Sequence, residues 1–186
     1  MDNHLFTKLN MSTPFRISIF CPDKIGLVSA VTGRLFDLGT NLGDTNFAVL
    51  GTSAEYKAVC TVPDTVNKSD IEEQLRTLPE LKEADIQVAP FKMQVSHTAI
   101  ANSTHRIIVD GGDSPGLVAR LTEVFVEFQA NIVRLNTEVT PRKTGDQYRI
   151  DIYVHIPNPS VQACLATVEN TASTLQLRCL IETLSS

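Results

Sequence analysis

The chain has 186 residues, of which 42% are hydrophobic and 20% are charged, and its formal net charge at pH 7 is −5. This composition is ordinary for a globular protein and leaves room for one medium-sized domain or two small ones. The acidic balance argues against direct binding of nucleic acid, because proteins that bind it present a basic face to the phosphates.

The chain begins with MDNHLFTKLNMST, which lacks the apolar stretch of a secretory signal, and no apolar run elsewhere is long enough to span a membrane. We therefore expect residues 1–13 to be a leader, within which Met11 is a second candidate for the start of translation. The four cysteines show no C-x-x-C spacing, so we expect core thiols in a reduced, cytoplasmic protein and no metal site. They are Cys21, Cys60, Cys164 and Cys179.

The first half of the chain changes between two apolar periodicities. Apolar residues at every second position predict strands, and apolar residues three or four apart predict helices. Gly39 suits the left-handed conformation that ends a helix, and Ser69 with Glu72 matches a capping box at the start of another. The expected elements are a strand over 15–21, a helix over 27–38, strands over 41–50 and 56–62, a helix over 69–78 and a strand over 86–88.

The second half repeats this order. The segment DKIGLVSAVTGRLF, which begins at Asp23, returns as DSPGLVARLTEVFV, which begins at Asp113. A repeat with the period of a small domain indicates two copies of one folding unit. Ser114 and Pro115 suit the cap and first turn of a helix, and Ser160 suits the cap of another. The expected elements are a strand over 105–111, a helix over 117–128, strands over 131–140 and 148–156, a helix from 160 and a strand over 175–181.

Each half therefore has the order β-α-β-β-α-β. This order predicts an α+β protein made of two tandem ferredoxin-like units, each an antiparallel sheet with its helices on one face. The expected boundaries are a leader over 1–13, a first domain over 14–90, a linker over 91–103 and a second domain over 104–186. Pairing two sheets edge to edge would cover the edge strands.

The repeated turn from strand to helix is the candidate site. The first turn of a helix exposes unpaired backbone N–H groups and the positive end of the helix dipole. Gly26 and Gly116 lie at this turn, where the lack of a side chain lets a ligand approach the backbone. Such a turn is suited to a carboxylate.

Four polar side chains lie close to these turns in the sequence. The carboxylates of Asp23 and Asp113 can accept a hydrogen bond from an ammonium group. Asn41 and Asn131 begin the next strand, and an amide can donate to a carboxylate and accept from an amine. Together with the glycine turns, these groups predict a site for a zwitterionic amino acid.

Each of these residues also has a structural interpretation. The aspartates can cap the following helix, the glycines can allow close packing of helix on sheet, and the asparagines can turn the chain after the helix. Asn46 and Asn136 fall inside predicted strands, where asparagine is uncommon, so they indicate a β-bulge or an interface contact.

The segments DKIGLVSAVTGRLFDLGTNL and DSPGLVARLTEVFVEFQANI resemble ACT domains, whose hallmark is a D-x-P-G-hydrophobic turn, a helix and an Asn-hydrophobic strand start. Two such units over residues 14–184 resemble the glycine cleavage system transcriptional repressor family. The resemblance implies amino-acid binding at interfaces between units. The residues it implies for the site are Asp23, Gly26, Leu27 and Asn41, and Asp113, Gly116, Leu117 and Asn131.

The first copy departs from the family pattern at one position. Ile25 stands where the pattern has proline, whereas the second copy keeps Pro115. Proline presets the backbone of the turn. The first site is therefore expected to bind more weakly than the second, differently, or not at all.

The resemblance implies a regulatory protein without catalytic activity or cofactor, which binds a small amino acid, with glycine or serine expected. The sequence has no helix-turn-helix pattern, so we expect control through contact with a transcription regulator, and a homodimer. The alternative is a regulatory subunit of an amino-acid biosynthetic enzyme. Catalysis is disfavoured because the sequence has no H-E-x-x-H or G-x-S-x-G motif, and RNA binding because it lacks the aromatic RNA-recognition pattern.

Overall fold

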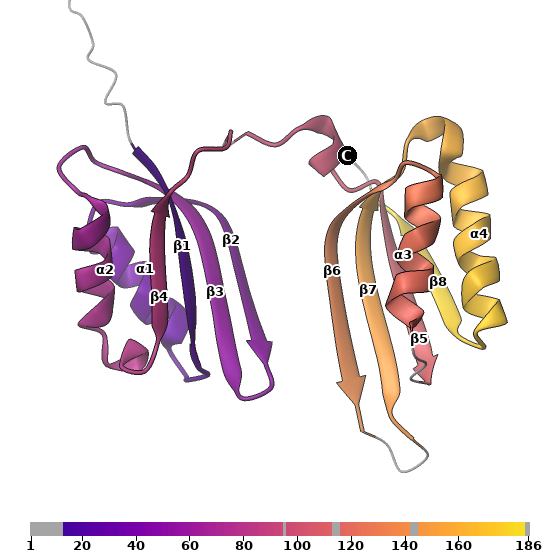
Figure 1. The fold of residues 1–186 in the computed structure, drawn as a ribbon, viewed down its shortest axis with the longest axis horizontal. Coiled ribbons are helices and arrows are strands. Elements are labelled where there is room, and N and C mark those ends of the chain that lie inside the picture. Colours follow the sequence, from indigo (N-terminus) through magenta and orange to yellow (C-terminus); the bar gives the residue numbers. More distant parts are fainter. Residues whose placement is uncertain (1–12, 95, 113–115, 142–144, 185–186) are drawn as a thin grey trace, which may run out of the picture. The chain divides into compact units, whose positions relative to one another are not determined.

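The computed structural model describes residues 13–94, 96–112, 116–141 and 145–184. The chain forms two compact units, Met1–Val95 (unit 1) and Ser96–Ser186 (unit 2). Each unit contains one four-stranded antiparallel sheet, and the order of its main elements is β-α-β-β-α-β (Figure 1). The predicted fold of two tandem ferredoxin-like units is confirmed.

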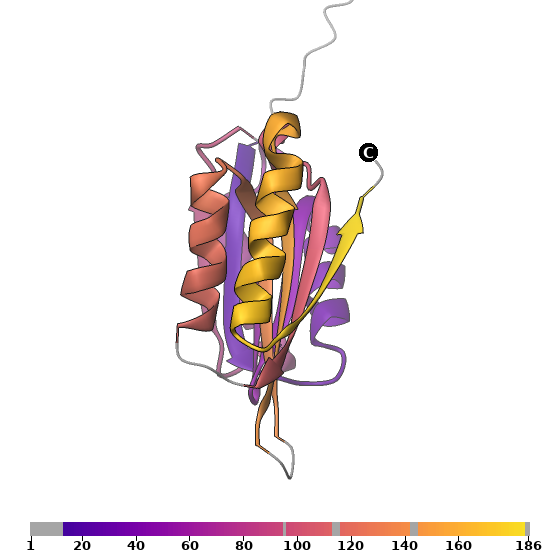
Figure 2. The same cartoon turned by 90° about the vertical axis from the view of Figure 1, so that its right-hand side faces the viewer.

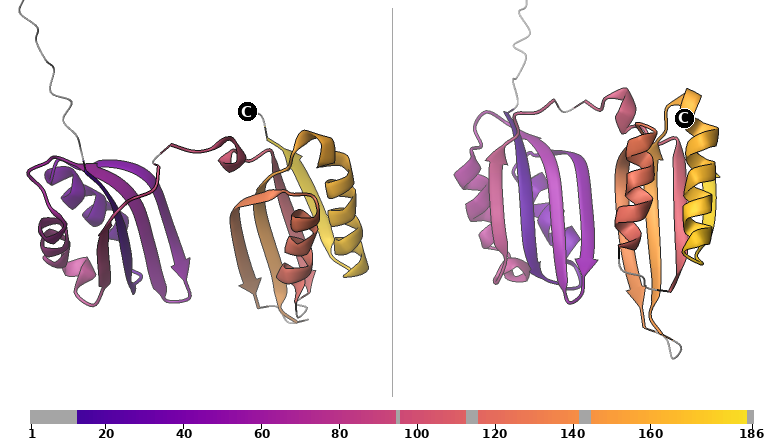
Figure 3. Two further views of the ribbon diagram at one scale, coloured as in Figure 1. Left: turned by 45° about the horizontal axis from the view of Figure 1, so that its top comes forward. Right: turned by 45° about the vertical axis from the view of Figure 1, so that its right-hand side comes forward.

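Unit 1 forms its sheet in the order β2-β3-β1-β4, so β2 and β4 are the edge strands. Helices α1 and α2 lie on one face of this sheet (Figure 3). The elements of unit 1 are β1 (Thr13–Pro22), α1 (Leu27–Asp37), β2 (Asn41–Leu50), β3 (Ser53–Val62), α2 (Lys68–Arg76), η1 (Pro79–Leu81) and β4 (Asp85–Pro90).

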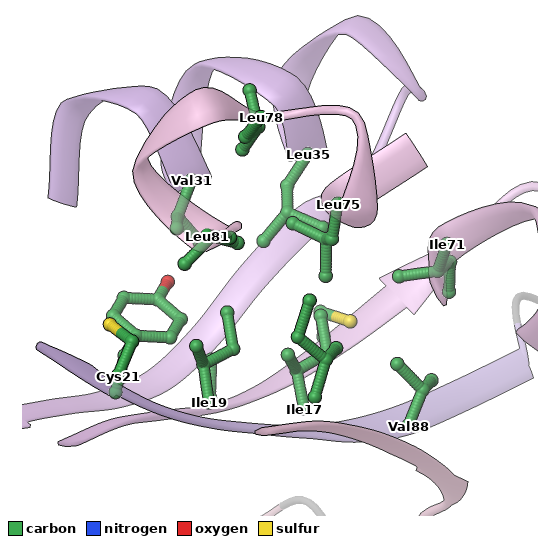
Figure 4. Close-up of a cluster of buried hydrophobic side chains, with 14 of the residues drawn as sticks. Ile17, Ile19, Cys21, Val31, Leu35, Ile71, Leu75, Leu78, Leu81 and Val88 are labelled. Carbon is green, nitrogen blue, oxygen red and sulfur yellow. The ribbon is translucent and has the colours of Figure 1, made fainter. Parts of the chain in front are cut away.

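The core of unit 1 follows from the two periodicities of its sequence. Alternate residues of β1 point toward the helices, so that Ile17 and Ile19 meet Leu35 of α1 and Leu75 of α2 (Figure 4). All four side chains are almost completely buried. Burying one such side chain stabilises the fold by about 1.5–3 kcal/mol.

Unit 2 repeats the arrangement with the strand order β6-β7-β5-β8. Its two α-helices lie side by side on one face of the sheet (Figure 2). The elements are η2 (Ala99–Ala101), β5 (His105–Gly112), α3 (Leu117–Glu127), β6 (Asn131–Thr140), β7 (Gln147–His155), η3 (Asn158–Ser160), α4 (Val161–Thr174) and β8 (Arg178–Thr183).

The two cores are filled differently at one equivalent position. Cys21 of β1 is buried in unit 1, and its counterpart in β5 is Gly111. A Cβ atom on Gly111 would lie 2.2 Å from Cδ2 of Leu177. Leu177 therefore occupies the space that a larger residue on β5 would need.

The cysteines are free thiols, as the sequence predicts. Cys21, Cys60 and Cys164 are buried, and Cys179 is half-buried against the core of unit 2. Burial raises the pKa of the Cys60 and Cys164 thiols to about 11. These side chains are neutral apolar filling at physiological pH.

The capping box of α2 uses different residues from those predicted. The side chain of Asn67 accepts hydrogen bonds from the backbone N–H groups of Ser69 and Asp70, and the Asp70 carboxylate accepts one from the Asn67 N–H at 2.8 Å. Ser69 lies inside the helix, so the prediction of Ser69 and Glu72 was wrong. Glu72 instead accepts a hydrogen bond from the backbone of β4.

Three further predictions at element ends have mixed outcomes. Ser160 precedes α4 as expected, but its side chain makes no capping hydrogen bond. Asn46 and Asn136 pair regularly within the sheets, whereas the bulges fall nearer the strand starts, at residues 43–44 and at residue 133. Residues 1–12 of the predicted leader, Ser114 and Pro115 lie outside the described residues, whereas Thr13 already belongs to β1. The N-cap position of α3 is Gly116. None of the helices in the described ranges has the length and hydropathy needed to span a membrane.

Candidate functional site

The turns before α1 and α3 share an unusual backbone conformation. Gly26 and Gly116 occupy the N-cap positions with φ angles of 86° and 78°, in the left-handed region. A Cβ atom on either glycine would have no heavy atom within 4 Å. The backbone conformation therefore accounts for these glycines, and close packing of helix on sheet does not.

The helix that follows each turn has no side-chain cap. Asp23 does not cap α1; it is exposed, and its backbone N–H donates to the Thr52 carbonyl at 3.0 Å. Its counterpart, Asp113, lies outside the described residues. Leu27 and Leu117 are buried, so only their backbone groups face the turn. The Leu27 N–H donates to the Lys24 carbonyl at 3.3 Å, so the donors left for a ligand at α1 are the later N–H groups of its first turn, beside the positive end of the dipole.

The asparagines lie at the opposite end of each unit from these turns. Asn41 pairs with Thr61, which pairs with Pro14 near the start of β1, whereas Asp23 follows Pro22 at the end of β1. At about 3.4 Å per residue, Pro14 and Pro22 lie about 27 Å apart. The structure therefore does not bring the asparagine and the glycine turn of one unit together, and one small ligand cannot touch both.

In unit 2 the asparagine already has a partner within the chain. Nδ2 of Asn131 donates to the carbonyl of Ile100, in η2, at 2.9 Å. Nδ1 of His155 lies 2.8 Å from the Asn102 carbonyl oxygen, and the Thr104 hydroxyl accepts from the backbone of Ile156 at 3.0 Å. Asn131 thus helps to fasten the segment before β5 onto β6 and β7, a role that sequence reasoning missed.

In unit 1 the corresponding asparagine faces an open groove between α1 and the start of β2. Among the described residues, none forms a hydrogen bond with the Asn41 side chain, and the nearby Thr40 hydroxyl is buried without a partner. The Phe36 ring is 78% exposed beside them. The groove has a volume of about 510 Å³ and is lined by Ser29, Thr32, Gly33, Phe36, Thr40, Asn41 and Leu42.

Sequence reasoning missed most of this groove. Its helical residues lie on one face of α1 at positions 29, 32, 33 and 36, but all except Phe36 are small or polar and so carry no apolar signal. A search for polar and small residues on the face opposite the core would have found them.

The open face of the sheet in unit 2 carries an ordered polar cluster. The Tyr153 ring lies between two guanidinium groups, 5.4 Å from that of Arg106 and 5.2 Å from that of Arg134. Arg106 also forms a bidentate ion pair with Asp151, at 2.9 and 2.6 Å, and this hydrogen bonding lowers the pKa of the Asp151 carboxyl. A second carboxylate, that of Glu182, lies 3.3 Å from Arg106.

This cluster differs from an RNA-binding face, because the Tyr153 ring is covered by the arginines and Arg106 is neutralised by carboxylates. Tyr56 is buried, and Tyr148 packs against the core of unit 2. His105 is also buried, and burial lowers the pKa of its ring, whose Nδ1 lies 2.9 Å from the Thr104 hydroxyl.

No protein-family model matches the sequence, and no curated protein matches it either. Solved structures do match. A protein of unknown function from Galdieria sulphuraria is 22% identical over 94% of this chain and 99% of that chain, with a TM-score of 0.72. A protein assigned as a glycine cleavage system transcriptional repressor is 15% identical over 95% of this chain and 99% of that chain, with a TM-score of 0.67. The resemblance to that family is thus confirmed at the level of the fold, which extends over almost the whole of each chain.

Proposed function

We propose that this protein is a regulator that binds a small amino acid and acts through contact with other proteins, as a glycine cleavage system transcriptional repressor-like protein. The observation that carries the proposal is the left-handed glycine before an uncapped helix, present at equivalent places in both units. The fold shared with the structure assigned as such a repressor supports it. Four free cysteines fit the reducing cytoplasm.

The chemistry of the turn suits a zwitterion. A carboxylate of the ligand accepts hydrogen bonds from the first-turn N–H groups of α1, and the Asp23 carboxylate accepts one from the ammonium group. The proposed residues are Asp23, Gly26 and the backbone of Leu27 in unit 1, and Gly116, the backbone of Leu117 and Asp113 in unit 2. The proposed partner is a transcription regulator protein, and this chain does not contact nucleic acid itself.

A homodimer would add the asparagine to this site. The outer edge of β2 is unpaired in its sheet. Antiparallel pairing of two β2 strands sets the start of one against the end of the other. This arrangement would bring Asn41 of one copy close to the Gly26 turn of a second copy, which a single unit cannot do.

Thermal unfolding with a panel of amino acids tests the proposal. A ligand present at 100 times its dissociation constant adds about 2.7 kcal/mol to the free energy of unfolding, which is a clear rise in Tm. We expect glycine or serine to raise the Tm and Gly26→Ala to weaken that effect. Calorimetry would confirm the affinity.

Gly145→Ala is the matched control, because Gly145 also has a positive φ and open space around it but lies in the β6–β7 connection. Both variants place a side chain at a positive φ, and only Gly26→Ala changes the proposed site. No rise in Tm across the panel would contradict the proposal. Co-purification with a large biosynthetic enzyme would favour a regulatory subunit instead.

A further inference from the structure

The residues that line the groove between α1 and β2 are partly replaced at the equivalent positions of unit 2. The two copies align with an offset of 90 residues, so each groove residue has a defined counterpart. Ser29 is replaced by Ala119 and Thr40 by Ala130, which removes two hydroxyl groups. The counterpart of Gly33 is a glutamate, at position 123, and its carboxylate adds bulk and negative charge.

The asparagine is kept in both copies but is available in only one. In unit 2, η2 packs against β6, and the Ile100 carbonyl accepts a hydrogen bond from Asn131 Nδ2 at 2.9 Å. In unit 1 no described residue forms a hydrogen bond with the Asn41 side chain. The bond in unit 2 also shows which partner this amide takes, namely a neutral carbonyl oxygen.

We propose that the amino-acid site that uses the strand-start asparagine exists in unit 1 only, and that in unit 2 this asparagine is a clasp for the linker. In unit 1 a carboxylate oxygen of the ligand accepts from Asn41 Nδ2, in the place that the Ile100 carbonyl takes in unit 2. The buried Thr40 hydroxyl is a second donor to the ligand. The inference rests on the proposed function and narrows it to unit 1: the Gly116 turn gains no asparagine and holds no ligand by itself, so each chain binds one ligand.

This assignment reverses the expectation from the turn sequences alone. The family proline at residue 115 favoured the second copy. The groove favours the first copy, since a glutamate at the Gly33 position would repel a carboxylate within reach. The polar groups that face a ligand are thus concentrated in unit 1.

Calorimetric titration of the full-length protein with glycine and with serine tests the inference. We expect a stoichiometry of one ligand per chain. Asn41→Ala should weaken binding at least tenfold, and Gly33→Glu should do the same. A Cβ on Gly33 would meet no atom within 4 Å, so alanine fits there, and Gly33→Ala separates the effect of the carboxylate from that of the first added carbon.

Asn131→Ala is the matched variant in unit 2. We expect it to keep the stoichiometry and affinity of the wild type but to lower the Tm without ligand, whereas Asn41→Ala should leave that Tm nearly unchanged. A stoichiometry of two, or loss of binding in Asn131→Ala alone, would overturn the inference while the proposed function stands. Equal Tm values for the two asparagine variants without ligand would show that Asn131 does not act as a clasp. If no amino acid binds the wild-type protein, both proposals are wrong.

Discussion

At the scale of single residues, the best-defined polar contact is the one between Arg106 and Asp151 on the open face of unit 2. Its geometry is bidentate, and both side chains are largely shielded, with exposed fractions of 28% and 19%. An ion pair that has two hydrogen bonds and is partly shielded from solvent stabilises the folded state more than a fully exposed ion pair does. The pair lies between β5 and β7 and so holds the two central strands of the sheet together.

Asp151→Asn should therefore change how the stability of the protein depends on pH. The folded-state pKa of Asp151 lies below its unfolded value of about 3.9, so the stabilisation is fully present above that pH and is lost as the pH falls through the folded pKa. We expect the variant to be less stable by about 1.5 kcal/mol at pH 7 and the difference to shrink below about pH 4. Urea unfolding between pH 3 and pH 7 measures this.

Asp110→Asn provides a comparison between the same two strands, because Asp110 of β5 lies 3.4 Å from the more exposed Arg149 of β7. Its effect at pH 7 should be smaller. A difference between wild type and Asp151→Asn that stays constant over the whole pH range would contradict the role given to the ion pair.

At the scale of elements, α2 begins differently from α1 and α3. Helix α2 has a complete capping box, whereas α1 and α3 begin at left-handed glycines without any side-chain cap. A capped start satisfies its own N–H groups, and an uncapped start leaves them available to a ligand or to water. The difference separates a helix that serves stability from the two that carry the proposed site.

Asn67→Ala should lower the free energy of unfolding by about 1 kcal/mol, because it removes the acceptor for two backbone N–H groups. Ser160→Ala should have little effect, since the Ser160 side chain makes no capping bond. Chemical denaturation of both variants measures the contrast. Equal losses would show that the capping geometry at these two helices was misassigned.

The sequence predicts elements better than it predicts their ends. Period and repeat identify all eight strands and all four α-helices of the described structure, because alternating burial leaves a direct pattern. The start of α2 was misassigned because N-x-x-D and S-x-x-E overlap by two residues, and only geometry selects between them. The glycine turns of the candidate site were found, whereas the Asn131–Ile100 bond joins distant residues and leaves no local signal.

At the scale of the whole molecule, each unit has a core of its own. The buried cluster of unit 1 draws only on residues 15–88, and that of unit 2 only on residues 107–177. A core formed within one segment lets that segment fold without the rest of the chain. Each copy of the repeated sequence therefore contains the core of a complete folding unit.

Residues 96–186 expressed alone should therefore fold cooperatively. We expect a single thermal transition by circular dichroism and a well-dispersed NMR spectrum. Leu121→Ala in this fragment should lower the free energy of unfolding by about 3 kcal/mol, since Leu121 is buried in the core. A fragment without a cooperative transition would show that the core of unit 2 is insufficient by itself.

The exchange between Cys21 and Gly111 has a consequence for the history of the two copies. In unit 2 the space above the sheet is filled by Leu177, from the segment before β8, so a cysteine at position 111 would require the Leu177 side chain to shift. Glycine at position 21 would in turn remove a buried side chain from the core of unit 1. A chimaera that exchanges the first strands of the two units should therefore exchange the residue that packs against this position as well. The two copies have diverged inside their cores as well as at the proposed site.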